Sequence, residues 1–132
     1  MALIVHKYGG TSVGSVDRIA NVAYRLEKWH SAGHQLVVVV SAMSGETDRL
    51  INLAKKVQQI PDARELDVVA STGEQVTVGL IAMALLERGL KAKSYTGAQV
   101  HVLTDSSFNK ARILSIDEKK IRADLESGTI VV

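Results

Sequence analysis

A lysine followed by a cluster of glycines stands near the start of the chain and is its strongest sign of chemistry. Lys7 follows an apolar segment, residues 2–5, and precedes Gly9, Gly10 and Gly14. Glycines let the backbone approach a ligand closely and adopt positive φ, so successive N–H groups can converge on an anion that a lysine neutralises. The pattern indicates a phosphate site at a strand-to-helix turn. An ordinary turn with a surface lysine is the simpler alternative.

Two common phosphate-binding motifs do not fit this segment. A Walker A loop places its lysine after the glycines and directly before Ser or Thr, whereas Lys7 precedes them. The dinucleotide fingerprint needs G-x-G-x-x-G spacing and an acidic residue at the end of the second strand, and the sequence has neither. The segment therefore belongs to another class of phosphate-binding protein.

Two further turns carry polar side chains that suit a small zwitterion beside a phosphate donor. Ser41 and Thr47 offer hydroxyl groups, and Glu74 offers a carboxylate that can pair with an ammonium group. Each also has a purely structural interpretation. Ser and Thr are common turn and cap residues, and a glutamate at a helix start interacts favourably with the helix dipole.

Hydrophobic periodicity and cap residues predict the helices that position these side chains. A first helix is capped by Ser15 or Asp17, ends at Gly33, and carries Ile19, Val22, Ala23, Leu26 and Trp29 on one face. A second begins at Thr47 or Asp48 and is closed by Pro61, and a short third covers residues 64–70. Ser71, Thr72 and Gly73 then interrupt, a long apolar helix runs from Glu74 to Glu87 before Gly89, and Asp117 caps a last helix that Gly128 ends.

The strands predict an α/β fold with a mainly parallel sheet sandwiched by helices. The run at 36–40 is apolar on both faces, as in a central parallel strand that helices cover, and further strands are expected at 92–95, 113–114 and 129–132. Residues 96–110 are expected to be irregular. Ligands bind at the carboxyl ends of such strands, so the turns at 7–10, 41–48 and 71–74 should share one rim.

The last predicted strand, residues 129–132, coincides with the end of the chain. A strand that is apolar on both faces needs neighbours, so the sequence predicts an N-terminal fragment of a larger protein. It also predicts an exposed apolar edge at 129–132 that favours self-association.

Composition narrows the class of protein. The 132 residues are 46% apolar with one proline, which excludes disorder, and a net charge of +2 without a basic stripe argues against nucleic acid binding. The absence of cysteine excludes disulfides and thiolate metal sites, and Gly33 separates His30 from His34, so no metal site is expected. No long apolar run or signal-like leader is present, and we expect a soluble, cytoplasmic protein without membrane association.

Three segments together resemble one known family. Residues 5–14, VHKYGGTSVG, closely resemble the opening signature of the aspartokinases in the amino acid kinase superfamily. Residues 37–45, VVVVSAMSG, and 71–75, STGEQ, resemble the second and third aspartokinase motifs. The resemblance extends over essentially the whole chain, including residues 111–113 and 128–132.

The resemblance implies a site and a reaction. Residues 1–132 would form the N-terminal part of an amino acid kinase catalytic domain, without the rest of the nucleotide site and without regulatory domains. Lys7 is implied to contact the ATP phosphates and stabilise the transferring phosphoryl group, with Tyr8, Gly9, Gly10 and Ser41 completing the ATP wall. Thr47 and Glu74 match positions that hold the substrate aspartate, Glu74 at its α-ammonium group.

The implied reaction transfers the γ-phosphoryl group of ATP, with Mg²⁺, to the side-chain carboxylate of L-aspartate. The product, 4-phospho-L-aspartate, serves lysine, threonine and methionine biosynthesis. The enzyme is expected to be a homo-oligomer, and the fragment alone to be inactive. Two alternatives remain. One is a sister kinase acting on glutamate, carbamate or a nucleoside monophosphate, against which residues 71–75 argue, and the other is a non-catalytic binding or assembly module.

Overall fold

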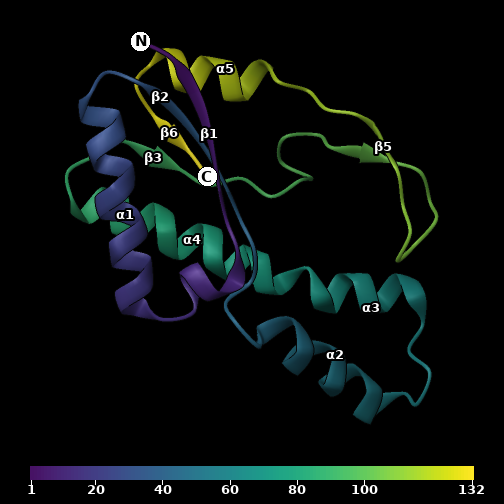
Figure 1. Cartoon of the computed structure of the whole chain (residues 1–132). Helices are drawn as coiled ribbons and strands as arrows, with labels where there is room; N and C mark the ends of the chain where they lie inside the picture. Colours follow the sequence, from purple (N-terminus) through teal and green to yellow (C-terminus); the bar gives the residue numbers. More distant parts are fainter.

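A four-stranded, fully parallel sheet forms the centre of the computed structural model, which describes residues 1–132 (Figure 1). The strand order is β1 (Leu3–Tyr8), β2 (Gln35–Val40), β6 (Ile130–Val131) and β3 (Ala92–Lys93). β1 pairs with β2 along its whole length, and β6 pairs with both β2 and β3. The predicted parallel sheet with β2 inside it is confirmed, although β3 and β6 are shorter than expected.

Two helices cover one face of this sheet. α1 (Val16–Ser31) and α4 (Thr72–Glu87) lie on the same side, and their apolar residues pack against alternate residues of β1 and β2 (Figure 1). α1 begins where the Ser15 hydroxyl accepts a hydrogen bond from the Arg18 N–H at 3.2 Å, which confirms Ser15 as the cap. The core consists of Val13, Ile19, Val22, Ala23, Leu26, Leu36, Val38, Ile81, Leu85, Ile130 and Val132. Trp29 was expected in it but is 47% exposed, because it lies in the last turn of α1 at the edge of the sheet.

The opposite face of the sheet is largely open. α5 (Lys119–Glu126) has only eight residues and crosses this face near the start of β2, where the Gln35 side chain donates to the Leu125 carbonyl at 3.1 Å. Val5 and Val39 beyond it are 62% and 47% exposed. The expectation that helices cover β2 on both sides therefore holds for one face and only for a part of the other.

The end of the chain does not form an edge of the sheet. β6 lies between β2 and β3, and Ile130, Val131 and Val132 are buried. The predicted exposed edge at 129–132 is wrong because β6 inserts between two strands that precede it in the sequence. The free edges of the sheet belong to β1 and β3.

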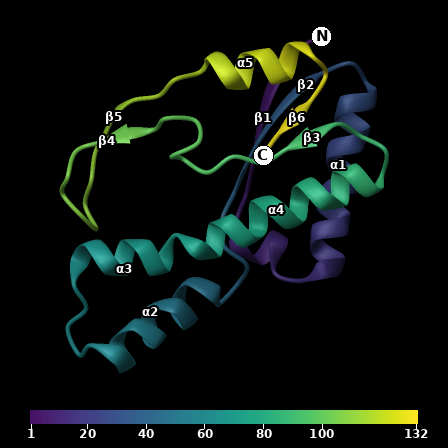
Figure 2. The same cartoon turned by 180° about the vertical axis from the view of Figure 1, so that it is seen from behind.

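Three shorter helices complete the part of the fold near the motif turns. A 3₁₀ turn, η1 (Gly10–Val13), follows β1, and α2 (Glu46–Val57) and α3 (Ala63–Ala70) form a separate pair at the start of α4 (Figures 1 and 2).

The ends of these helices differ from the predicted ones. Thr47 and Asp48 do not cap α2, because Gly45, with φ of +79°, is its N-cap and the helix already begins at Glu46. The interruption before α4 is confined to Ser71, so Thr72 and Gly73 are helical. α2 ends at Val57, before Pro61.

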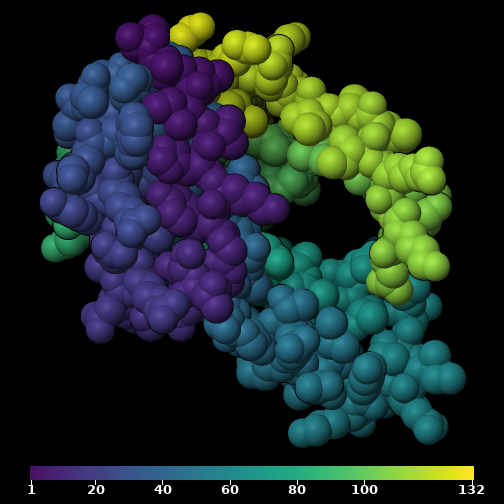
Figure 3. Space-filling view, in the orientation of Figure 1, coloured from purple at the N-terminus to yellow at the C-terminus, as the bar shows by residue number.

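A long arm, residues 94–118, connects β3 to α5 and extends away from the sheet to α3. It contains the antiparallel pair β4 (Leu103–Thr104) and β5 (Ile113–Ser115), of which β4 falls in the segment expected to be irregular. Near its tip, the Asn109 N–H donates to the Asp67 carboxylate of α3 at 2.9 Å. Figure 3 shows the opening that this contact leaves between the arm and the helices coloured teal.

One helical segment has the composition of a membrane span. Residues Ala63–Glu87, which comprise α3, the Ser71 turn and α4, are long and apolar enough to cross a bilayer by length and composition, although sequence analysis expected no such segment. A core helix of a globular protein can meet the same criteria, and α4 contributes Ile81 and Leu85 to the core. Only 28% of the most apolar 18-residue stretch of this segment is buried. The segment is therefore more apolar than its contribution to the core requires.

Candidate functional site

The three predicted turns meet at the carboxyl ends of β1 and β2. A Cβ atom added to Gly10 would lie 2.9 Å from the Ala42 carbonyl oxygen, and one added to Gly73 would lie 2.9 Å from the Ala42 Cβ. The Ser44 N–H donates to the Gly10 carbonyl at 3.2 Å. Residues far apart in the sequence are therefore packed around Ala42, as expected for loops that follow parallel strands.

The motif glycines serve close packing rather than an unusual backbone conformation. Gly9 has φ of −76° and Gly14 of −74°, and Gly10 is not among the residues with positive φ. The prediction that these glycines adopt positive φ is wrong. Gly10 is required because the second turn approaches it too closely for a side chain, whereas nothing lies within 4 Å of a Cβ on Gly9. The backbone at Gly9 is thus exposed to any ligand at this turn.

Lys7 lies near the end of β1 on the open side of the sheet. Its Cα is the register partner of Val39, and its side chain is exposed. Lys7 and Tyr8 line a hollow of about 480 Å³ with Arg25, Lys28, His6 and Trp29, so this surface is rich in positive charge. Burial raises the pKa of the Tyr8 hydroxyl, and nearby Arg25 partly offsets that rise. A cationic hollow beside an exposed lysine suits a polyphosphate.

Glu74 opens onto a larger cleft over the open face of the sheet. The cleft has a volume of about 690 Å³, and Val37, Val39 and Val131 form its floor. Glu74 and Gln75 from the first turn of α4 and residues 95–98 after β3 form its walls. Because Lys7 neighbours Val39 in the sheet, the lysine lies one strand away from this cleft. The cleft has the size of a small-molecule site and contains few polar groups.

Ser41 and Thr47 lie beside this arrangement and line neither the cleft nor the hollow. Ser41 follows β2, is half-buried, and its N–H donates to the Tyr8 carbonyl at 3.2 Å. Thr47 is exposed in the first turn of α2. The structure thus brings Lys7, Tyr8, Gly9, Gly10 and Ser41 together at the ends of two adjacent strands. Thr47 lies on α2, outside this group.

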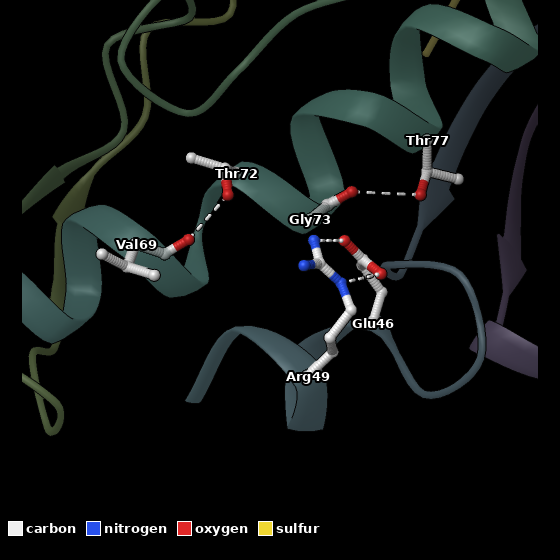
Figure 4. Close-up of polar contacts among 6 residues, drawn as sticks. All are labelled: Glu46, Arg49, Val69, Thr72, Gly73 and Thr77. Carbon is white, nitrogen blue, oxygen red and sulfur yellow. Dashed lines mark hydrogen bonds and ion pairs between the residues drawn. The ribbon is translucent and has the colours of Figure 1, made fainter. Parts of the chain in front are cut away.

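The first turn of α2 carries an ion pair that the sequence patterns did not reveal. Glu46 accepts two hydrogen bonds from the Arg49 guanidinium, at 3.0 and 2.6 Å, and this pairing lowers the pKa of the Glu46 carboxyl (Figure 4). The Glu46 side chain also lies against Gly73, at 3.7 Å from the position of an added Cβ. The i, i+3 spacing of opposite charges was the available signal.

Side-chain hydroxyls secure the break between α3 and α4. Thr72 donates to the Val69 carbonyl at 2.7 Å, and the buried Thr77 donates to the Gly73 carbonyl at 3.3 Å (Figure 4). These bonds occupy carbonyl groups on both sides of the Ser71 turn. They hold in place the first turn of α4, which carries Glu74.

The chain holds no group of three or more His, Asp or Glu side chains that could bind a metal ion.

The sequence did not single out Arg25 and Lys28 as candidate site residues, because both belong to the helical pattern of α1. Only the fold places them in the same hollow as Lys7.

Comparisons with known proteins show a family match and several similar relatives. The family model described as the Amino acid kinase family matches residues 2–132. The chain is 64% identical over 132 residues to an aspartate kinase of Pseudomonas putida and 61% identical to an aspartokinase of Pseudomonas aeruginosa; each match covers 100% of this chain and 32% of the relative. The chain thus spans about a third of the length of these curated relatives.

Solved structures show the same fold. A crystal structure of an aspartate kinase from Synechocystis matches with a TM-score of 0.81 and 42% identity, over 98% of this chain and 21% of that one. E. coli aspartokinase III, crystallised with aspartate and ADP, matches with a TM-score of 0.82 at 18% identity, over 99% of this chain and 40% of that one. At that identity the second match supports the fold alone.

Proposed function

Because the chain belongs to the amino acid kinase family, we propose that it supplies the aspartate pocket and one phosphate-binding wall of an aspartokinase. The observation that carries this proposal is the convergence of the three motif turns around Ala42, in a chain 64% identical to an aspartate kinase. The reaction is transfer of the ATP γ-phosphoryl group to the side-chain carboxylate of L-aspartate, giving 4-phospho-L-aspartate and ADP. This product leads to lysine, threonine and methionine.

The phosphate wall is formed by the end of β1 and the turns that follow β1 and β2. Lys7 neutralises charge on the ATP phosphates, and the open backbone at Gly9 lets those phosphates approach. Tyr8, Gly10 and Ser41 fix the shape of this wall through the 3.2 Å hydrogen bond between β1 and β2 and the close packing on Ala42. Mg²⁺ would be bound by the ATP phosphates and would neutralise part of their charge.

The aspartate pocket is formed at the starts of α2 and α4. Glu74 faces the cleft and pairs with the α-ammonium group of aspartate, a charge-assisted contact that selects an amino acid. Thr47, exposed in the first turn of α2, supplies a hydroxyl for the substrate. Phosphoryl transfer depends on holding donor and acceptor in line with charge stabilised, so no covalent enzyme intermediate is required.

A chimaera tests this proposal. Residues 1–132 replace the matching third of the Pseudomonas putida aspartate kinase, and ADP release is measured with aspartate, glutamate, carbamate and a nucleoside monophosphate as acceptors. We expect aspartate-dependent turnover close to that of the parent enzyme and little with the other acceptors. The 132-residue chain alone is the matched control, and we expect no turnover from it.

Two results would contradict the proposal. A well-folded chimaera that prefers glutamate, carbamate or the nucleotide would identify a sister kinase. A well-folded chimaera without turnover on any acceptor would favour a non-catalytic module.

A further inference from the structure

The arm, residues 94–118, is attached to the rest of the molecule at its root and at its tip. Its two strands are exposed, with Leu103 and Leu114 57% and 63% exposed, so burial does not hold the arm in place. Hydrogen bonds along its length join residues of the arm to one another. Between residues 103 and 115, Asn109 alone donates hydrogen bonds to another element, which is α3 (Figures 1 and 3). The position of the arm therefore depends on one residue near its tip.

Asn109 and Asp67 make a contact of several hydrogen bonds. The Asn109 backbone N–H donates to the Asp67 carboxylate at 2.9 Å. The side-chain amide of Asn109 faces the same carboxylate, and its nitrogen donates to the second oxygen at 2.5 Å and to the Ala63 carbonyl at 3.2 Å. Asn109 has φ of +64°, a left-handed conformation that asparagine adopts more readily than most residues. Hydrogen bonds to a carboxylate are charge-assisted and stronger than neutral ones, so this contact can hold an exposed segment.

The contact joins the two walls of the cleft over the open face of the sheet. One wall carries Glu74, in the first turn of α4, and Asp67 lies seven residues before it on α3. The opposite wall consists of residues 95–98, at the root of the arm that carries Asn109. A segment fixed at both ends has less conformational freedom than one fixed at one end only. The contact between Asp67 and Asn109 therefore restricts how far the two walls can separate.

We propose that Asp67 and Asn109 form a latch that holds the arm against α3 and thereby positions the cleft wall opposite Glu74 for the amino acid substrate. This inference rests on the proposed function, because it assumes that aspartate binds beside Glu74. Both latch residues are positioning residues that do not touch the substrate. When the latch is open, the binding-competent cleft is populated for only a fraction of the time, and the apparent affinity for aspartate falls by that fraction. The hollow beside Lys7 contains no residue of the arm, so ATP binding should not depend on the latch.

Steady-state kinetics of the chimaera separates positioning from stability. In Asp67→Ala, KM for aspartate should rise about threefold to tenfold, while kcat and KM for ATP stay within about twofold. Glu65→Ala is the matched control, because Glu65 is an exposed carboxylate on the same helix and pairs with Arg64 rather than with the arm. Asp67→Asn should restore part of the affinity, since its amide oxygen still accepts the Asn109 backbone N–H. Urea unfolding of the 132-residue chain should be nearly the same in all three variants.

A second measurement follows the arm directly and needs no activity. The chain has no cysteine, so Lys110→Cys and Lys56→Cys place one spin label near the tip of the arm and one on α2. Both lysines are exposed, and neither belongs to the latch. Pulsed electron spin resonance should give one narrow distance distribution between the labels. The distribution should become broader and longer when Asp67→Ala is added, and stay unchanged when Glu65→Ala is added.

Two results would overturn the latch. One is an unchanged distance distribution in Asp67→Ala. The other is an active chimaera in which this variant leaves KM for aspartate unchanged, or lowers kcat and stability instead, as a merely structural contact would. A folded chimaera without aspartate turnover would contradict the proposed function, and with it the effect on the substrate, whereas the distance measurement still decides whether Asp67 holds the arm.

Discussion

The two faces of the sheet differ in what their side chains do. Leu36 and Val38 point to the face that α1 and α4 cover, and both are buried in the core. Val37 and Val39, the alternate residues of the same strand, form the floor of the cleft. A strand that is apolar throughout can therefore stabilise the fold on one side and form a ligand site on the other. Stability should depend mainly on the covered face and catalysis on the open face and its rim.

The largest expected effect tests the catalytic side of this comparison. Lys7→Ala in the chimaera should reduce turnover with little change in stability, because Lys7 is exposed at the rim and contributes nothing to the core. Loss of a charge-stabilising group typically raises the barrier by about 2–4 kcal/mol. Steady-state ADP release measures the effect, and Lys55→Ala, at an exposed position of α2, is the control. Near-normal turnover in Lys7→Ala would refute the assigned role.

The stability side is tested by two neighbouring valines. Val38 is 3% exposed on the covered face, and Val39 is 47% exposed on the open face. Val38→Ala should lower the free energy of unfolding by about 2–3 kcal/mol, from the lost burial of two methyl groups and the cavity left behind. Val39→Ala should change it by less than about 0.5 kcal/mol. Urea unfolding of the 132-residue chain compares them, and equal losses would mean that the open face is also part of the core.

Glu74 tests the selectivity of the open face. Glu74→Gln keeps the shape of the side chain but removes the charge that pairs with the α-ammonium group, which is worth about 1.5–3 kcal/mol. KM for aspartate should therefore rise roughly tenfold to a hundredfold, with KM for ATP nearly unchanged. Glu87→Gln, at the other end of α4, is the control. If both Michaelis constants rise together, Glu74 serves the helix dipole instead.

The glycine pair at the rim separates packing from ligand approach. Gly10→Ala should destabilise the chain by about 1–3 kcal/mol, because its Cβ would lie 2.9 Å from a backbone oxygen. Gly9→Ala meets nothing within 4 Å and should leave stability unchanged, yet slow the chimaera if phosphates approach this backbone. Urea unfolding measures the stability of both variants, and ADP release measures the activity of the corresponding chimaeras. Full activity in Gly9→Ala would remove Gly9 from the ATP wall.

The smallest effect concerns His6, at the edge of the covered face. Burial lowers its pKa from the ordinary value of 6.5, so the folded state binds a proton less readily than the unfolded state. Stability should therefore be complete above pH 6.5 and decrease as the pH falls below it. Urea unfolding between pH 5 and pH 8 measures the slope, which should be smaller in His6→Gln. An identical slope in that variant would assign the pH dependence to other groups.

The covered face was the part of the fold that sequence patterns predicted well. Ile19, Val22, Ala23 and Leu26 are buried at helical spacing as expected, and the valine run forms the inner strand β2. The open face was not predicted, because a strand apolar on both faces gives no sign of which face lacks a helix. The position of β6 between β2 and β3 depends on long-range pairing that local patterns do not contain.

The sequence predicted that the three motif turns converge, but not the detailed geometry of their contacts. The three turns were expected on one rim, and they meet at Ala42. The close contacts that require Gly10 and Gly73 arise between segments about 30 residues apart, so only the fold reveals them. Arg25 and Lys28 on α1 likewise line the same hollow as Lys7, although their spacing in the sequence indicates an ordinary helix surface.

The most direct test of the central claim is a crystal structure of the chimaera with ADP and L-aspartate. The account predicts that the Lys7 ammonium group lies within about 3 Å of a phosphate oxygen and that the Glu74 carboxylate lies at the same distance from the aspartate α-ammonium group. Both ligands should lie over the open face, between the end of β1 and the start of α4. Ligands bound elsewhere, with Lys7 and Glu74 in contact with solvent only, would contradict it.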